Sequence, residues 1–440
     1  MSIIRCWRGV SAGISRPTAF AVVGVAAVLL VGGCNGQRRG NGGPPTDPPA
    51  PITFELRASG LPEKGIWKCD PAIGDINGDG HLDLAAIPRL QPSTLAWLND
   101  GKANWRQSAE GLNWGRPTCG GDIELVDVNR DGKLDIVVAD HCHGISVFLG
   151  DGAGGWSMVA DRLHPTVADE DGRVSEFHGA ESVAIGDVNA DGHLDLVAIG
   201  SDDGGINVWH GDGTGKNWAR VNDDLPKTRF GVRILLHDVN GDGRLDILCT
   251  REEGPRCWLN NGDGTWKPYS VGLPTPVSGG IYNGLAVADL NRDGRPDVIV
   301  GNWIDGPEVY LQRDDGAWQK QATVFPECKG GGWGVAAADV DQDGHLDLVF
   351  CGRLPQEVGY VYGVFLLLGD GTGSSWRWVR NSGLPQTGLE YNWGVAVADL
   401  NGDGVPDIVA TSGSSPVSGE QSAPVIPQRV LTWIGKKAAR

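Results

Sequence analysis

Residues 75–83 read Asp-Ile-Asn-Gly-Asp-Gly-His-Leu-Asp, and this nine-residue pattern recurs along the chain. Six further copies share its register, at 127–135, 187–195, 238–246, 289–297, 339–347 and 399–407. Successive copies begin 50 to 60 residues apart. An internal period of this size is typical of repeat architectures, in which each repeat is one supersecondary unit. The 440-residue chain is therefore predicted to contain seven similar units.

The chemistry of the pattern indicates a metal site. Ca²⁺ takes six to eight oxygen ligands, and a tight loop supplies them from alternate positions. Positions 1, 3, 5 and 9 carry Asp or Asn in every copy, and position 6 is always Gly, which permits a left-handed turn. The predicted ligands of about seven Ca²⁺ ions are Asp75, Asn77, Asp79, Asp83, Asp127, Asn129, Asp131, Asp135, Asp187, Asn189, Asp191, Asp195, Asp238, Asn240, Asp242, Asp246, Asp289, Asn291, Asp293, Asp297, Asp339, Asp341, Asp343, Asp347, Asp399, Asn401, Asp403 and Asp407.

Two other interpretations of these loops are an EF-hand site and a turn without metal. The Glu at position 12 that closes a helical EF-hand loop is absent, so the loops belong to another framework. They are alternatively Asx-rich turns without metal. Several carboxylates in one turn repel one another without a cation, which favours calcium. The formal net charge of −18 also argues against a nucleic-acid-binding surface.

The residues around each loop predict four strands per repeat. Largely apolar runs such as 394–398 and 136–139 precede and follow the loops, and a third run such as 145–149 comes next. A Gly/Asp turn typical of hairpins leads to a fourth run, which opens with a tryptophan in six repeats. These tryptophans are Trp105, Trp156, Trp218, Trp266, Trp318 and Trp376. Four antiparallel strands repeated seven times predict an all-β, seven-bladed β-propeller with calcium-binding hairpin loops.

The two ends of the repeated region predict how the ring closes. The fourth run of a repeat ends in a phrase such as 381–385, Asn-Ser-Gly-Leu-Pro, but the seventh repeat stops after its third run, at 433–435. A matching phrase stands at the other end, in 54–62. We expect the N-terminal strand to complete the last blade and so remove the exposed sheet edges. One propeller domain is predicted over 53–436.

These repeats resemble the FG-GAP and VCBS repeat propellers, which include the integrin α-subunit head and many bacterial exported proteins. The resemblance covers about 53–436, and the seven-fold Asp-x-Asn-x-Asp-Gly-x-x-Asp motif carries it. An aromatic-Gly pair stands at 230–231, 333–334 and 393–394 and is degenerate elsewhere. The resemblance implies calcium loops on one face that stabilise the blades, with ligands bound on the opposite face or its rim. Function varies widely on this fold.

The N-terminus predicts export and a lipid anchor. Three arginines precede an apolar run over 19–31, which is the order of a secretory signal. Leu30-Val-Gly-Gly-Cys34 resembles the lipobox of bacterial lipoproteins, so residues 1–33 are predicted to be removed and Cys34 acylated. The alternative is an ordinary signal with an incidental cysteine. Residues 34–52 are predicted to form a flexible Gly- and Pro-rich tether. Asn35 favours the outer membrane if the cell has two membranes.

The face opposite the calcium loops carries the residues that break the repeat. From them we predict a ligand site that includes some of Trp114, Arg116, His141, His143, His178, Trp303, Trp333 and Trp393. The histidines, with Glu176, are also candidates for acid–base or metal chemistry. The alternative is that the aromatic residues only seal the central channel. Cys119–Cys142 and Cys249–Cys257 are the two candidate disulfides, although connectivity does not follow from sequence.

Three functions are compatible with these features. The leading hypothesis is an exported, lipid-anchored, calcium-stabilised binding or adhesion scaffold for a protein or glycan at the cell envelope. It is not an enzyme in this interpretation, and it is a monomer that contacts the membrane through its lipid anchor only. The first alternative is a lectin-like carbohydrate-binding protein, by resemblance to some fungal lectins. The second is a carbohydrate lyase or dehydratase built on the propeller.

Overall fold

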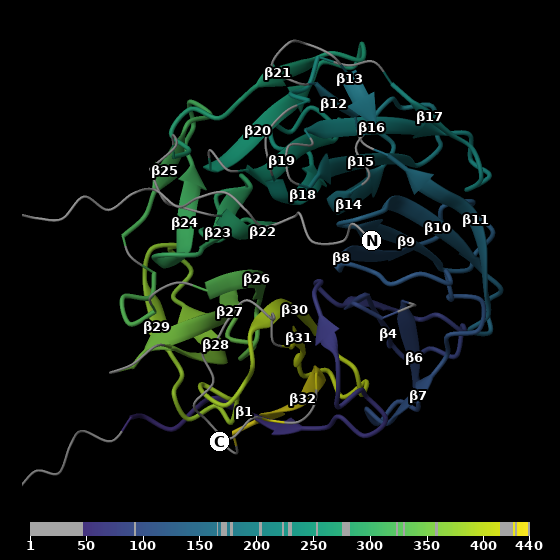
Figure 1. Ribbon diagram of the computed structural model, residues 1–440. Helices are drawn as coiled ribbons and strands as arrows, with labels where there is room; N and C mark the ends of the chain where they lie inside the picture. Colours follow the sequence, from purple (N-terminus) through teal and green to yellow (C-terminus); the bar gives the residue numbers. More distant parts are fainter. Residues whose placement is uncertain are drawn as a thin grey trace, which may run out of the picture. The chain divides into compact units, whose positions relative to one another are not determined.

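The computed structural model describes residues 47–91, 94–164, 166–168, 174–176, 179–201, 205–221, 224–227, 231–251, 254–274, 282–322, 324–328, 331–356, 360–413, 426 and 429–438. Seven four-stranded sheets are formed by these residues, which confirms the predicted all-β, seven-bladed propeller. Figure 1 shows the sheets arranged around a common centre. The predicted signal peptide, Cys34 and most of the predicted tether lie outside the described residues.

The blades are numbered in chain order, and each contributes an inner and a second strand. The inner strands are β3 (Ala72–Gly74), β8 (Gly121–Val126), β14 (Ala180–Gly186), β18 (Gly231–His237), β22 (Tyr282–Ala288), β26 (Gly331–Ala338) and β30 (Asn392–Ala398). The second strands are β4 (Asp83–Ala86), β9 (Asp135–Asp140), β15 (Asp195–Gly200), β19 (Asp246–Arg251), β23 (Asp297–Asn302), β27 (Asp347–Pro355) and β31 (Asp407–Ser412). In each blade the predicted calcium loop connects these two strands.

The third and outer strands complete each sheet. The third strands are β6 (Leu95–Asn99), β10 (Gly144–Gly150), β16 (Ile206–Gly211), β20 (Gly254–Asn260), β24 (Gly306–Gln312), β28 (Tyr360–Gly369) and β32 (Val430–Lys437). The outer strands of blades one to six are β7 (Trp105–Gln107), β11 (Trp156–Leu163), β17 (Trp218–Arg220), β21 (Trp266–Pro268), β25 (Trp318–Lys320) and β29 (Trp376–Trp378). Two short ribbons pair β2 (Ile66–Trp67) with β5 (Pro88–Arg89), and β12 (Thr166–Ala168) with β13 (Val174–Glu176).

The outer position of blade seven is occupied by the first strand of the described chain. β1 (Ile52–Leu56) pairs antiparallel with β32, from Ile52 opposite Lys437 to Leu56 opposite Trp433. The amide of Phe54 also donates to the carbonyl of Ser382 at 2.7 Å, so β1 contacts the end of blade six. The sheet of blade seven is therefore built from both ends of the described chain.

The core lies between the blades. All residues of the second strand are buried in blades one to five and in blade seven, as expected for strands covered on both faces. Tryptophans of the third strands are also buried, with Trp97 1% exposed and Trp433 2% exposed. Burial of such apolar surface is the main stabilising contribution, at about 25 cal/mol per Å². Among the described residues there is no helix able to span a membrane.

One of the two candidate disulfides is present. Cys119 and Cys142 are bonded, with their Cα atoms 5.6 Å apart. The Cys249–Cys257 pairing is wrong, because both residues are buried thiols. Leu248 lies directly opposite Cys257, and side chains alternate between the two faces of a sheet. Cys249 and Cys257 therefore point into different core layers, on the two sides of blade four.

Candidate functional site

The seven predicted calcium loops, at 75–83 and its six repeats, share left-handed residues at positions 4 and 6. In the first loop, the carboxylate of Asp75 accepts hydrogen bonds from the amides of Asp79 at 3.1 Å and Gly80 at 2.8 Å. Asp79 in turn accepts one from the amide of His81 at 2.9 Å. The bond from the position-6 glycine to the first aspartate is present in every copy. The backbone amides of each loop therefore hold the carboxylates toward the inside of the loop without the help of an ion.

Backbone conformation explains the invariant glycine and adds a position that the sequence pattern did not reveal. Position 6 is left-handed in all copies, for example with φ of +86° at Gly80. Position 4 is left-handed too, although four copies place Arg130, Ala190, Arg292 or Gln342 there with φ between +57° and +60°. Such residues adopt this conformation at a cost, so the loop is held by its surroundings.

The position-9 aspartate connects each loop to its sheet. Asp83 is fully buried, and it accepts one bond from the amide of Ile76 at 2.9 Å and another from the amide of Asn99 at 2.7 Å. The same two bonds recur for the other position-9 aspartates, which are also fully buried. Each carboxylate therefore joins its loop to the end of the third strand.

Side-chain amides extend this connection to the preceding blade. Asn99 Nδ2 donates to the carbonyl of Leu400 in the loop of blade seven at 2.7 Å. Asn260 donates in the same way to Val188 at 2.7 Å, and Gln312 to Val239 at 3.2 Å. A calcium loop is thus tied to its own blade and, at these positions, to a neighbouring one.

The sixth loop fits a divalent cation best. Carboxylate oxygens of Asp339, Asp341 and Asp347 lie within 4.8 Å of one another. Oδ1 of Asp339 is buried without a hydrogen-bond partner, whereas the equivalent oxygen accepts the position-5 amide in the other six loops. A cation would satisfy this oxygen. Asp341 replaces the asparagine whose amide contacts the position-5 carboxylate elsewhere, so this loop holds four carboxylates.

The fourth and fifth loops fit a divalent cation less well than the sixth loop does. Arg244 pairs with the position-5 carboxylate of Asp242, and its Nε donates to the carbonyl of Asn260 at 2.7 Å. Arg295 makes the equivalent pair with Asp293. These guanidinium groups compete with a cation for the same carboxylates. The seven sites are therefore chemically unequal although their sequences are nearly identical.

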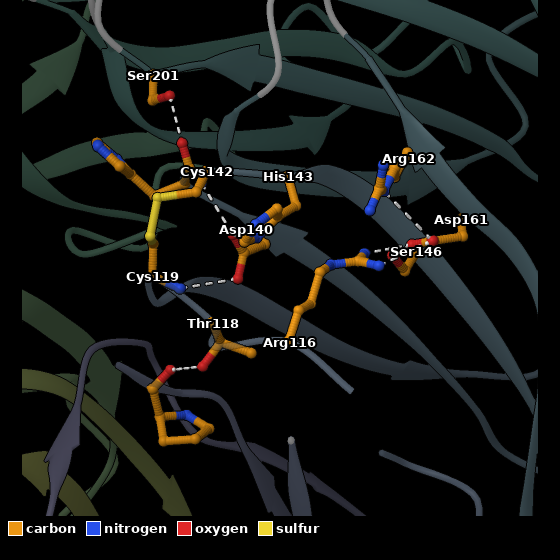
Figure 2. Close-up of polar contacts among 12 residues, drawn as sticks. Arg116, Thr118, Cys119, Asp140, Cys142, His143, Ser146, Asp161, Arg162 and Ser201 are labelled. Carbon is orange, nitrogen blue, oxygen red and sulfur yellow. Dashed lines mark hydrogen bonds and ion pairs between the residues drawn. A yellow bond between two sulfur atoms is a disulfide. The ribbon is translucent and has the colours of Figure 1, made fainter. Parts of the chain in front are cut away.

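On the face opposite the predicted calcium loops, the Cys119–Cys142 disulfide lies beside the buried carboxylate of Asp140 (Figure 2). Asp140 is fully buried and accepts hydrogen bonds from the amides of Cys119 at 2.9 Å and Cys142 at 2.8 Å. Nδ1 of His143 lies 2.9 Å from the same carboxylate. His143 is thus held against blade two by Asp140.

Arg116 and Trp114 form a second group beside it. Arg116 makes a two-point ion pair with Asp161, at 2.6 and 3.0 Å, which Figure 2 shows with Ser146 donating to the same carboxylate at 2.8 Å. The guanidinium also lies 5.1 Å from the ring centre of Trp114. Trp114 is only 8% exposed and stacks on Phe148, so its faces are largely occupied.

His141 is oriented by a buried carboxylate. Its Nδ1 contacts Glu181, which is 3% exposed and also pairs with Lys68. Burial alone would raise the pKa of Glu181, but Lys68 and His141 hold it well below its usual range. Glu181 therefore carries a negative charge that is paired with both Lys68 and His141.

A polar cluster that sequence reasoning missed occupies the inner strands. Nη2 of Arg233 pairs with Asp70 at 2.8 Å, and Nη1 pairs with Asp122 at 3.2 Å. Asp122 also accepts a bond from Ser182. These residues all stand five positions before a calcium loop, where the seven blades carry Asp70, Asp122, Ser182, Arg233, Gly284, Gly334 and Gly394. The loss of glycine at this position in blades one to four was the signal that could have found them.

The glycines at the same position in the later blades allow close packing. A Cβ added to Gly394 would lie 2.1 Å from the carbonyl oxygen of Cys69, and one added to Gly334 would lie 2.5 Å from the amide nitrogen of Val395. Asp70 accepts a bond from that same Val395 amide at 3.2 Å. The inner strands are therefore closely packed at blades six and seven, whereas ion pairs connect blades one, two and four.

An aromatic cluster lies over blades five to seven. Trp303 stacks on Tyr391 with centroids 5.5 Å apart, and Tyr391 contacts Trp393 at 4.5 Å. The guanidinium of Arg353 lies 4.6 Å from the ring centre of Trp303 and 3.9 Å from that of Tyr360. Trp393 is 5% exposed, whereas Trp303, Arg353 and Tyr360 are partly exposed.

The predicted ligand residues therefore fall into separate groups. Trp114 lies with Arg116, and His143 lies nearby on Asp140 (Figure 2). His141 joins the Glu181 pair, and Trp303 and Trp393 share the aromatic cluster through Tyr391. His178 and the side chain of Trp333 lie outside the described part of the chain. The assignment of ligand binding to these residues stays a prediction.

We expect the calcium sites to differ in affinity, with the sixth loop the tightest. Asp341→Asn should weaken calcium binding at that loop by about tenfold, because affinity follows the number of charged ligands. It should also raise the melting temperature of the metal-free protein by removing carboxylate repulsion. Isothermal titration of stripped, folded protein measures the first effect, and calorimetry the second. The converse Asn291→Asp change is the matched control, and absence of any calcium uptake would contradict the prediction.

Glu124 should make stability depend on pH. Burial, with the charge of Asp122, raises the pKa of Glu124 to about 8. The folded state then retains the proton that the unfolded chain loses near its ordinary pKa, so the free energy of unfolding should fall as pH rises from about 4.5 to 8. Glu124→Gln should flatten this decline, as measured by denaturant titration across that range. An unchanged slope in the variant would show that other groups cause it.

Comparison with known proteins agrees with the geometry. The FG-GAP-like repeat family matches residues 75–138, 127–198, 187–249, 238–300 and 289–350, and the FG-GAP repeat matches 391–423. Cartilage acidic protein 1 of Mus musculus is 31% identical over 202 residues, which are 43% of this chain and 30% of that protein. Integrin alpha pat-2 of Caenorhabditis briggsae is 27% identical over 290 residues, or 52% of this chain and 23% of that protein.

The chain thus spans about 30% or less of the length of these curated relatives. Among solved structures, BBS1N in complex with ARL6DN has a TM-score of 0.53 at 12% identity, over 88% of this chain and 97% of that one. An Agrocybe aegerita lectin that recognises non-reducing terminal N-acetylglucosamine has a TM-score of 0.49 at 20% identity, over 73% of this chain and 84% of that one. The repeat matches cover more than half of the sequence, so the chain belongs to the FG-GAP repeat family.

Proposed function

We propose that this protein is an exported, lipid-anchored propeller that is stabilised by calcium and binds a protein or glycan through the face opposite the calcium loops. The observation that carries the proposal is the contact of the Arg353 guanidinium with the rings of both Trp303 and Tyr360. Aromatic and arginine side chains that are partly exposed together are the residues that dominate binding energy at protein interfaces. They also supply the flat surfaces on which sugars pack.

The difference between the two faces supports this assignment. The calcium loops repeat seven times, and their carboxylates are engaged by their own backbone, which leaves little to distinguish one partner from another. The opposite face is irregular around the ring: blade two presents His143 and the Arg116–Asp161 pair, and blades five to seven present the aromatic cluster. A single asymmetric ligand requires such irregularity. Irregular loops on a rigid scaffold are where binding residues concentrate.

Calcium has a structural role in this proposal. Ions that bind the folded state stabilise it by mass action, and the loops are tied to their own and neighbouring blades. The ions would therefore keep the seven blades in register while the opposite face contacts the partner. Homologous integrin α subunits carry the same repeats, which supports a binding scaffold over a dedicated catalytic fold.

We expect Arg353→Ala and Trp303→Ala to lower partner binding by about tenfold or more, because both truncate the clustered surface. A glycan array and an envelope pull-down, each run with and without chelator, identify a partner, and surface plasmon resonance then compares the variants. Lys133→Ala, on an exposed calcium-loop residue, is the control. If the control abolishes binding while both other variants retain affinity and melting temperature, the opposite face is not the binding face.

The anchor is tested separately. Cys34→Ser should move the protein from the membrane fraction to the soluble fraction, because acylation at Cys34 is the only membrane attachment proposed. Mass spectrometry of the mature N-terminus should find a lipid-modified cysteine as the first residue. An unmodified cysteine, or cleavage at another position, would rule out the anchor without affecting the binding proposal.

A further inference from the structure

A side-chain hydrogen bond joins two neighbouring predicted calcium loops, the sixth at 339–347 and the seventh at 399–407. Nε2 of Gln342 donates to the carbonyl of Gly404. Gln342 stands at position 4 of its loop, and Gly404 stands at position 6 of the next loop. The two residues are 62 apart in the sequence, so the packing of blade six against blade seven brings them together.

Position 4 of one loop also faces position 6 of the following loop at the preceding boundary. A Cβ added to Gly344 in the sixth loop would lie 3.2 Å from Nη2 of Arg292, which is position 4 of the fifth loop. The first, fourth and seventh loops carry glycine at position 4, and the third carries Ala190. Those residues have no side chain long enough to cross. A long side chain at position 4 is therefore what allows one loop to contact the next.

The backbone of Gln342 makes this contact depend on the order of its own loop. Gln342 is left-handed, with φ of +60°, and a residue other than glycine adopts this conformation at a cost. The sixth loop has to hold that conformation for the side chain to stay directed at Gly404. The bond between the two loops therefore requires an ordered sixth loop.

The sixth loop lacks two bonds that hold the other loops. In those six, the position-5 amide donates to the first aspartate, and the position-3 asparagine donates to the position-5 carboxylate. In the sixth, Oδ1 of Asp339 has no partner among the described residues, and Asp341 has no amide group to donate. Its four carboxylates also repel one another until a cation binds. The order of this loop therefore depends on calcium more than that of the others.

The seventh loop belongs to the blade that both ends of the described chain complete. The amide of Gly404 donates to Asp399 at 2.8 Å, while its carbonyl accepts the bond from Gln342. Asp407 of the same loop accepts a bond from the amide of Gly435 at 2.8 Å, and Gly435 lies opposite β1. Order in the seventh loop is thereby connected to the sheet that β1 completes.

We propose that Ca²⁺ bound in the sixth loop raises the affinity of the seventh loop for Ca²⁺ through the bond from Gln342 to Gly404. This coupling rests on the calcium role proposed above. An ion in the sixth loop would fix Gln342, and its bond would restrict the seventh loop before a second ion arrives. The second ion then loses less conformational entropy on binding, which couples two sites that share no ligand. Gln342 acts here as a positioning residue.

The test follows the assigned amide resonances of Gly344 and Gly404 by two-dimensional NMR while calcium is titrated into the metal-free, folded full chain. Each amide donates to the first aspartate of its own loop, so each reports on one site. Gln342→Gly should raise the midpoint calcium concentration for Gly404 about threefold and leave that for Gly344 unchanged. The variant should stay folded, because glycine occupies this position in three other loops.

Arg130→Gly in the second loop is the matched control. It makes the same kind of change to a left-handed residue, with φ of +57°, in a loop that does not neighbour the seventh. It should leave both midpoints unchanged. Asp343→Ala, which removes a predicted ligand of the sixth loop, should raise the Gly404 midpoint about threefold, and adding Gln342→Gly should raise it no further.

Three results would overturn the coupling: an unchanged Gly404 midpoint in Gln342→Gly, an equal shift in Arg130→Gly, or additive effects of Asp343→Ala and Gln342→Gly. If neither amide responds to calcium, the calcium role and the coupling fail together. If both amides respond and Gln342→Gly has no effect, the coupling alone fails.

Discussion

The propeller depends on a buried carboxylate at the ninth position of each loop. Each of these aspartates accepts an amide bond from its own loop and another from the end of the third strand. Burial raises the pKa of several of them, to about 6 for Asp83 and about 7 for Asp347, so the fold accepts an electrostatic cost at this position. The hydrogen bonds, and a cation where one binds, offset that cost.

This arrangement couples metal binding to the ring. Because strand three is bonded to its own loop, and Asn99, Asn260 and Gln312 reach the loop of a preceding blade, order in one loop supports order in the next. The blades share core layers as well, so a blade has no complete core of its own. A closed ring of such units leaves its opposite face free to vary, since its stability comes from elsewhere.

Departures from the repeat are where the chemistry of this protein is found. The inner-strand position that is glycine in blades five to seven is charged or polar in blades one to four, which joins Arg233 to Asp70 and Asp122. Arg353 in blade six is a departure of the same kind. In this chain, the residues that pack between blades repeat from blade to blade, whereas the residues on the face opposite the predicted calcium loops do not.

The sequence alone determined the number of blades and their strand order, because local spacing dictates them, and the invariant glycine predicted a left-handed turn in each loop. It also placed a tryptophan at the start of the outer strand in six blades, since these residues recur in register. It did not reveal that Cys249 and Cys257 point to opposite faces, because strand register decides this. Nor did it reveal the Arg233 cluster or the contact of Arg353 with Trp303 and Tyr360. Those features join residues far apart in the chain, and only the closure of the sheets into a ring brings them within contact distance.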